Sequence, residues 1–273
     1  MKSNLLDLSR GVLLFAFNTN NVNYVKIADL NAQCISKYLK LPITLITDNE
    51  SNPKFNYHQV IRVEQTQSNI RFLKNTGIVE WKNVDRYLAY KLTPYDETLV
   101  LDCDYFMFNN SILKLFNLKY DYKIAYDMIT LDGTISYNLM GPNALPQVWA
   151  TAFIFKKTEK TKSFFNLIER IQLNYNYYRV LFGIREQNFR NDFAFSMANI
   201  ILNGYTIDPT INFPWAIFTI EDTLFKIELH KTFFVARLKN TAPILPIQNI
   251  HFMDKDYLQS DDFTYFIEKI LNE

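Results

Sequence analysis

Residues 87–104 read YLAYKLTPYDETLVLDCD, and this stretch decides the fold. A helical pattern ends at Pro94, an apolar run then predicts a strand over Thr98–Leu101, and Asp102 and Asp104 follow that strand directly. Such apolar strands are typical of parallel sheets that are covered on both faces. Two carboxylates at the carboxyl edge of a parallel sheet are a candidate site for a divalent cation.

The amino-terminal part of the chain predicts a β-α-β unit. Gly11–Phe17 is a continuous apolar run, and apolar residues recur with a helical period from Tyr24 to Tyr38. A second short strand is predicted over Ile43–Asp48. A right-handed crossover puts the polar loop Asn18–Asn21 at the carboxyl edge of the sheet, where open α/β sheets bind ligands.

The remaining elements follow from the same patterns. Residues 129–147 contain two glycines and two prolines and predict a long irregular loop. Asn191 is the predicted N-cap of a helix that ends at Gly204. The other predicted strands are His58–Val63, Lys123–Tyr126, Trp149–Phe155, Phe225–Leu229 and Phe233–Leu238, and the other predicted helices are Asp85–Thr93, Ile112–Phe116, Lys160–Tyr178, Asn191–Leu202 and a helix opened by Asp261 and Asp262.

Length and composition predict one mixed α/β domain. The chain has 273 residues, of which 48% are hydrophobic, so it can bury a large core. No linker or repeat divides it, and we expect a nucleotide-binding half over about 1–128 and an acceptor half over about 129–273. Two cysteines, no signal-peptide pattern and no apolar run of membrane-spanning length favour a soluble cytoplasmic protein.

The Asp102-Cys103-Asp104 pattern alone has two interpretations. Two acids at a strand end can simply be solvated, and Asp-x-Asp arises often by chance. Alternatively, like charges this close repel each other unless a cation lies between them. Oxygen ligands select Mg²⁺, Mn²⁺ or Ca²⁺, and such an ion could bridge the phosphates of a nucleotide.

Three landmarks together resemble a known family. The segment Arg86-x5-Leu92-Thr93-x-Tyr95-x6-Asp102-x-Asp104 is similar to the glycogenin and galactosyltransferase group of nucleotide-sugar glycosyltransferases, family 8, which have the GT-A fold. Residues 15–20, FAFNTN, followed by Tyr24, resemble the first strand and nucleotide-binding loop of that family. Residues 250–255, IHFMDK, resemble its His-x-x-Gly-x-x-Lys segment, although the glycine is missing and the spacing is shorter.

This resemblance implies roles for individual residues. Asp102, Asp104 and His251 would bind Mn²⁺ or Mg²⁺, and Asp102 would also contact the nucleotide sugar. Lys255 would lie against the diphosphate, and Arg86 against phosphate or sugar. Preplaced cations suit that position because cleavage leaves extra negative charge on the leaving group. The base and ribose would be held by Phe17, Asn18, Thr19 and Tyr24, although Phe17 fits the core equally well.

Asp192 is the remaining candidate carboxylate. Residues 191–195, NDFAF, resemble the family's Asp-Gln region at the start of a helix on the acceptor side. There Asp192 would act as a general base in an inverting reaction, or orient sugar and acceptor in a retaining one. The alternative is structural, since acids are favoured in the first turn of any helix.

One basic stretch bears on the acceptor. Residues 156–190 carry eight basic and three acidic side chains, a net charge of +5, interleaved with tyrosine and phenylalanine. This pattern fits a solvated amphipathic helix, a nucleic-acid surface, or a surface for a glycan or lipid-linked sugar. The carboxyl-terminal helix is acidic at its start, which disfavours a basic membrane-docking tail there.

The sequence therefore predicts a metal-dependent glycosyltransferase. It would move a sugar from a nucleoside diphosphate, with UDP expected, to a hydroxyl acceptor such as a hydroxylated base in phage DNA. The alternatives are an enzyme that builds a bacterial surface glycan, a nucleotidyltransferase with the same Asp-x-Asp metal site, and a binding module without activity.

Overall fold

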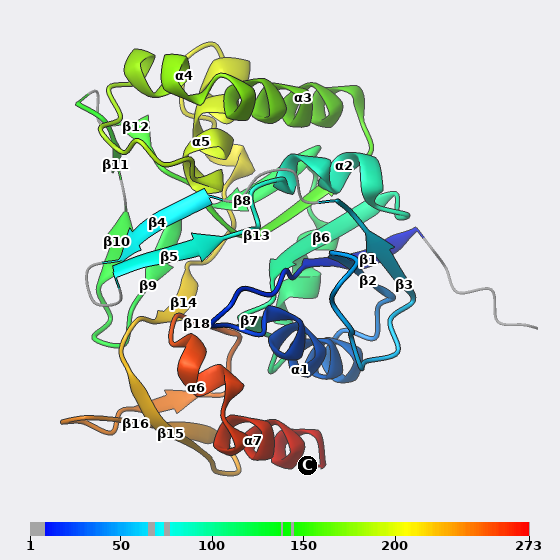
Figure 1. Ribbon diagram of the computed structural model, residues 1–273, viewed down its shortest axis with the longest axis vertical. Coiled ribbons are helices and arrows are strands. Elements are labelled where there is room, and N and C mark those ends of the chain that lie inside the picture. The colour runs from blue at the N-terminus through cyan, green and yellow to red at the C-terminus, as the bar shows by residue number, and fades with distance from the viewer. Residues whose placement is uncertain (1–8, 65–68, 74–76, 138, 143–144, 273) are drawn as a thin grey trace, which may run out of the picture.

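A computed structural model describes residues 9–64, 69–73, 77–137, 139–142 and 145–272. Its centre is a six-stranded sheet in the order β3-β2-β1-β6-β13-β8 (Figure 1). The first four strands are parallel, and β13 runs antiparallel to both of its neighbours. The bounds are β1 Arg10–Phe15, β2 Ile43–Thr47, β3 Gln59–Arg62, β6 Glu97–Asp102, β8 Tyr122–Ala125 and β13 Trp149–Lys156.

The apolar runs of the central strands are explained by burial on both faces. In β1, Val12 and Leu14 enter one core cluster, while Leu13 and Phe15 enter the other. The first cluster lies under α1 Tyr24–Tyr38 and α7 Asp261–Asn272, and the second lies under α3 Glu159–Leu173 and α5 Asn191–Leu202. Alternate side chains along a strand point to opposite faces, so consecutive positions in the middle of these strands are apolar.

A second sheet, in the order β10-β9-β14-β18-β7, continues from the carboxyl edge of the first. Its strands are short: β7 Tyr105–Phe106, β9 Asp127–Ile129, β10 Ile135–Tyr137, β14 Ile217–Ile220 and β18 Ile250–Phe252. Strand β18 pairs parallel with β14 and antiparallel with β7, so it lies beside the chain that leaves β6. This sheet therefore brings the carboxyl-terminal part of the chain to the Asp102–Asp104 turn.

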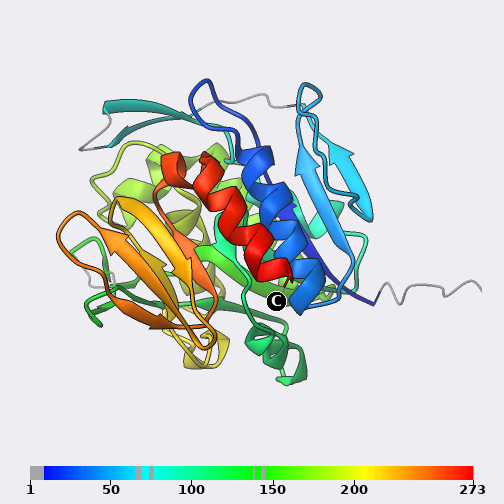
Figure 2. The same cartoon turned by 90° about the horizontal axis from the view of Figure 1, so that it is seen from below.

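Smaller elements complete the molecule. A three-stranded sheet and α7 lie at one end, as Figure 2 shows from below, and α4 Tyr175–Leu181 lies at the other (Figure 1). No helix in the described ranges is both long and apolar enough to cross a membrane. The remaining elements are η1 Arg86–Leu88, α2 Ala89–Leu92, η2 Ser111–Asn117, η3 Pro209–Ile211, α6 Lys255–Gln259, β15 Leu224–Leu229, β16 Phe233–Leu238, β17 Ile244–Pro246, and the two hairpins β4 Asn69–Leu73 with β5 Gly77–Trp81 and β11 Leu139–Met140 with β12 Leu145–Pro146.

The predicted mixed, mostly parallel α/β fold is confirmed, and so are the first β-α-β unit and the strands β15 and β16, which pair as a hairpin. Three local predictions are wrong. Residues 129–147 contain short paired strands, the helix over 160–178 is interrupted at Asn174, and the N-cap of α5 is Arg190. The Asn191 side chain instead donates to the Asn83 carbonyl at 2.8 Å. It makes this tertiary contact and does not cap the helix.

Candidate metal and nucleotide site

The candidate site lies at the edge of the central sheet where β1 and β6 end and β13 begins. Phe15 pairs with Asp102, so the loop after β1 starts beside the first acid. On the other side of β6, Ala152 pairs with Leu101, which places Ala150 and Thr151 at the level of Asp102. The predicted nucleotide loop, the acid pair and the start of β13 therefore meet at this edge.

The side chains of Asp102, Asp104 and His251 form a group that could hold a metal ion. One ligand atom from each lies within 4.8 Å of the others. His251 Nε2 is 3.5 Å from Asp104 Oδ1, and its Nδ1 is 3.4 Å from the Thr219 hydroxyl, which orients the ring. The pairing of His251 with Tyr105 across β18 and β7 explains how residues so distant in sequence come together.

Asp104 provides the test of whether a cation fits this group. Its carboxylate is buried, and Oδ1 makes no hydrogen bond to any described residue. His251 Nε2, 3.5 Å away, is too far for a strong hydrogen bond to Oδ1, and a buried carboxylate oxygen without such a bond is costly unless a ligand satisfies it. Two carboxylates and an imidazole form a donor set that suits Mn²⁺ or Mg²⁺, so the residues present fit such an ion.

Lys255 is the closest cation to Asp104. Its Nζ lies 2.5 Å from Asp104 Oδ2 and donates to the Phe252 carbonyl at 2.8 Å. Burial alone would raise the pKa of the Asp104 carboxyl, but Lys255 and His251 outweigh burial and hold that pKa well below its usual range. The Asp104 carboxylate is therefore ionised at neutral pH and available as a ligand.

Arg86 is buried beneath the site. Its guanidinium forms an ion pair with Asp102 and donates to the Ala150 carbonyl, and the side-chain oxygen of Asn83, in the orientation that satisfies its amide, accepts from it. Burial lowers the pKa of the Arg86 guanidinium, an effect that Asp192 and Asp104 oppose. In the structure Arg86 contacts Asp102 and strand β13. A contact of Arg86 with a phosphate stays a prediction.

Asp192 lies in the first turn of α5 beside the same strand. Its Oδ1 accepts from the Ala150 amide at 3.0 Å, and its Oδ2 pairs with Arg190 at 3.1 Å. Ala150 therefore connects Asp192, through its amide, with Arg86, through its carbonyl. The sequence did not single out Arg190 as a partner of Asp192, since it is one of eight basic residues in its segment.

The predicted nucleotide loop is held by its own side chains. Asn18 Oδ1 accepts from the Val25 amide, and the Thr19 hydroxyl accepts from the Val22 amide. Phe17 is 4% exposed and belongs to the second core cluster, which agrees with the core interpretation left open from the sequence. Tyr24, half-buried, begins α1 and packs against the first core cluster.

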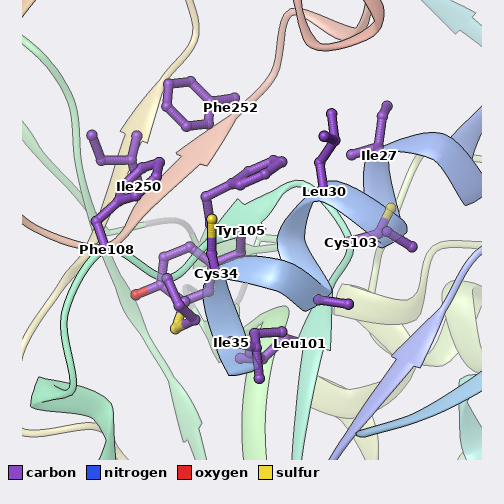
Figure 3. Packing of buried hydrophobic residues seen from close by; sticks show 14 of the residues in the cluster. Ile27, Leu30, Cys34, Ile35, Leu101, Cys103, Tyr105, Phe108, Ile250 and Phe252 are labelled. Carbon is purple, nitrogen blue, oxygen red and sulfur yellow. The ribbon is translucent and has the colours of Figure 1, made fainter. Parts of the chain in front are cut away.

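Two residues that the sequence analysis missed hold the site together. Asn31, fully buried on α1, donates to the carbonyls of Cys103 at 3.2 Å and Tyr105 at 2.8 Å. Figure 3 shows the face of α1 around Cys34 packed on the segment from Leu101 to Tyr105. Gln259, at the end of α6, accepts from the Asn23 amide at 2.7 Å and so joins the Lys255 helix to the first loop.

Comparisons with known proteins support the fold. No family model and no curated protein sequence matches this chain. The solved structure of the galactosyltransferase LgtC, in complex with donor and acceptor sugar analogues, has a TM-score of 0.51 at 10% identity, over 96% of this chain and 94% of that chain. An active-site mutant of LgtC gives the same values. The apo-form glycosyltransferase GlyE of Streptococcus pneumoniae has a TM-score of 0.40 at 13% identity, over 72% of this chain and 44% of that one.

At 10% identity, the likeness to LgtC establishes the fold. The GT-A fold expected from the three sequence landmarks is therefore confirmed over nearly the whole chain. The roles of the individual site residues stay predictions.

Proposed function

We propose that this chain is a metal-dependent glycosyltransferase that uses a nucleoside diphosphate sugar. The observation that carries the proposal is the Asp102, Asp104 and His251 group, in which the buried Asp104 Oδ1 makes no hydrogen bond to a described residue. The fold supports it, because the chain resembles LgtC over 96% of its length and the acid pair follows β6 at the carboxyl edge of the sheet, where open α/β sheets bind ligands.

Asp102, Asp104 and His251 are the residues that would hold the ion. When bound, Mn²⁺ or Mg²⁺ supplies Lewis-acid stabilisation to a diphosphate leaving group. Lys255, at the start of α6, adds a positive charge next to that position and would stabilise the charge that develops as the bond to the sugar breaks. Arg86 would act from below, by fixing the orientation of the Asp102 carboxylate.

Formal charges suggest that metal and nucleotide bind together. Asp102 and Asp104 carry two negative charges, and Arg86 and Lys255 carry two positive ones, so the group is neutral before an ion binds. A dication leaves an excess of positive charge that the diphosphate of the donor neutralises. We therefore expect Mn²⁺ alone to bind weakly and to bind more tightly in the presence of UDP.

Asp192 is proposed to act on the sugar or acceptor side. Its two oxygens already contact the Ala150 amide and Arg190, which favours an orienting role over proton abstraction. UDP as the nucleotide, and a hydroxyl group as the acceptor, follow from the resemblance seen in the sequence. A cytoplasmic location is part of the proposal, and the two buried free thiols, Cys34 and Cys103, are consistent with it.

The acceptor is proposed as one of two classes, a hydroxylated base in phage DNA or a glycan. The DNA class is supported by the basic and aromatic residues between 156 and 190. A transfer assay with hydroxymethylated DNA and with simple saccharides separates the two classes. A parallel reaction with a nucleoside triphosphate and a sugar phosphate tests the rival activity, since a nucleotidyltransferase would release pyrophosphate there, whereas glycosyl transfer from a UDP-sugar releases UDP.

A thermal-shift panel of nucleotide sugars, with and without Mn²⁺, tests the donor and the metal together. A ligand at about one hundred times its Kd adds roughly 2.7 kcal/mol to the free energy of unfolding. We expect Asp104→Asn to lose the stabilisation by Mn²⁺ with UDP, and Asp29→Asn to keep it. Asp29 is a matched control, because it is also buried but binds the Lys54 and Phe55 amides away from the site. Full stabilisation of the Asp104→Asn protein would show that the proposed site is wrong.

A further inference from the structure

Helix α6 and the predicted nucleotide loop come from opposite ends of the chain and are joined through Gln259. The loop follows β1 and ends at Asn23, the N-cap of α1, and Gln259 is the last residue of α6. Gln259 Oε1 accepts from the Asn23 amide at 2.7 Å, and its Nε2 donates to the Asn21 carbonyl at the longer distance of 3.5 Å. One side chain therefore bonds both a donor and an acceptor of the loop backbone.

The backbone of Gln259 adds a further contact. Its carbonyl accepts from Lys26 Nζ at 2.7 Å, and Lys26 lies in the first turn of α1. Asn23 Oδ1 accepts from the Lys26 amide at 2.8 Å, so the loop and the start of α1 are also bonded to each other. These contacts of Gln259 with Asn21, Asn23 and Lys26 form the α6–loop joint.

Helix α6 is the fixed side of this joint. Tyr257 and Leu258 are buried in the first core cluster, and the Tyr257 hydroxyl accepts from the Ile227 amide at 2.8 Å. By contrast, Asn21 and Asn23 are exposed. The position of an exposed segment with little packing depends more on its individual hydrogen bonds. The α6–loop joint therefore holds the loop to α6.

The same short helix carries the cation of the site. Lys255 is the first residue of α6, and its Nζ lies 2.5 Å from Asp104 Oδ2. Gln259 comes four residues later, which is about 6 Å along a helix. Figure 2 shows α6 and α7 beside α1, so this helix lies between the acid pair and the loop. The contacts of α6 thus set how far the loop lies from the Lys255 ammonium.

We propose that Gln259 is a positioning residue, which holds the nucleoside-binding loop at the distance from Lys255 that a nucleoside diphosphate requires. This inference rests on the proposed function, in which the loop holds base and ribose and Lys255 holds the diphosphate. A ligand that contacts two parts of a protein binds more tightly when those parts are ordered before it arrives, because binding then does not have to order them. Gln259 acts through the loop and not by touching the nucleotide.

A contact of the same kind elsewhere provides the control. Lys37 on α1 donates to the carbonyls of Ile270 and Leu271 at 2.6 and 3.2 Å, and so joins α1 to the end of α7. It lies in the last turn of α1, whereas the loop precedes the first turn. If the α6–loop joint only attached the carboxyl-terminal helices to α1, the loss of Gln259 and the loss of Lys37 would affect ligand binding alike.

Calorimetry in the presence of Mn²⁺ tests the proposal by comparing UDP with inorganic pyrophosphate, which has the diphosphate but no nucleoside. We expect Gln259→Met to lower the affinity for UDP by roughly five- to tenfold and to keep the affinity for pyrophosphate within about twofold of wild type, because only UDP uses the loop. Lys37→Met should leave both affinities unchanged. Lys26→Met removes the other bond of the α6–loop joint and should also weaken UDP selectively.

Two results would overturn the proposal. One is an affinity of Gln259→Met for UDP equal to that of wild type, and the other is an equal loss for UDP and for pyrophosphate, which would mean a general weakening of the site. If Gln259→Met does not fold, Lys26→Met carries the test with the same two refuting results. If the wild-type protein itself does not bind UDP, the proposed function fails and the role of Gln259 with it. If wild type and Gln259→Met bind UDP equally, only the role of Gln259 fails.

Discussion

Asn31→Ala is the sharpest test of how α1 positions the acid pair. Asn31 is fully buried and donates two hydrogen bonds, to the carbonyls of Cys103 and Tyr105, on either side of Asp104. Its Oδ1 also accepts from the Met107 amide at 3.4 Å. The alanine variant removes these partners and leaves buried backbone groups unsatisfied.

The expected loss of stability follows from those contacts. Each of the two shorter bonds contributes about 1 kcal/mol, and each buried carbonyl left without a partner costs about 1–3 kcal/mol. Allowing for relaxation, the free energy of unfolding should fall by roughly 2–4 kcal/mol. Urea unfolding followed by circular dichroism measures this loss directly.

The effect on the site separates positioning from general stability. Loss of a residue that orients metal ligands typically lowers metal affinity by about 10–100-fold, so we expect weaker Mn²⁺ binding in the presence of UDP. Asn199→Ala is the control, because Asn199 is also buried but bonds the hydroxyls of Tyr122 and Tyr126 in the other core cluster. Equal Mn²⁺ affinity in the two variants, measured by calorimetry, would refute the positioning role of Asn31.

Three further predictions follow from other parts of the structure. Lys255→Met should lower the affinity for UDP by about tenfold or more, because it removes a positive charge next to the leaving group. The same change should leave Asp104 freer to bind Mn²⁺. Calorimetry with each ligand measures both effects, and an unchanged affinity for UDP would contradict the prediction. Burial raises the pKa of Cys34 to about 12, so its contribution to stability is complete below about pH 8.5 and declines as the pH rises above that value; thiol titration at pH 8 should find no reaction at Cys34 until urea is added. Gly11→Ala should lower the free energy of unfolding by roughly 1–3 kcal/mol, because a Cβ there would overlap the ring of the buried Tyr95; a melting temperature equal to that of wild type would refute it.

The sequence predicts those parts of the fold that are governed by local pattern. Strands β1 and β6 have continuous apolar runs, Val12–Phe15 and Leu99–Leu101, because helices cover both faces of the sheet, so these runs are visible in the sequence without any partner. Apolar residues recur clearly at the helical period in α1. The rule that β-α-β crossovers are right-handed then fixes the face of the sheet on which α1 lies. These local signals suffice to place Asp102 and the first loop at one edge of the sheet.

Elements that exist only through tertiary pairing could not be predicted in this way. Strand β7 has two residues and β18 has three, which is too short for a periodic pattern. Their pairing joins His251 to Tyr105 across more than half of the chain. Only the resemblance in IHFMDK pointed to His251, since a lone histidine on an extended segment is otherwise uninformative.

Buried polar residues form the other gap between sequence and site. Asn31 occupies a core position of α1, between Ile27 and Cys34, where a polar side chain is expected only if it has a partner inside the protein. The signal was present, but the partner carbonyls belong to a turn more than seventy residues away. Asn18 is a case in which the sequence named a residue whose atoms are partly occupied. The resemblance predicts that it binds the nucleotide of the sugar donor, but its Oδ1 already accepts from the Val25 amide. A motif therefore identifies which segments meet at the site, and the hydrogen bonds decide which of their atoms remain free to bind a substrate.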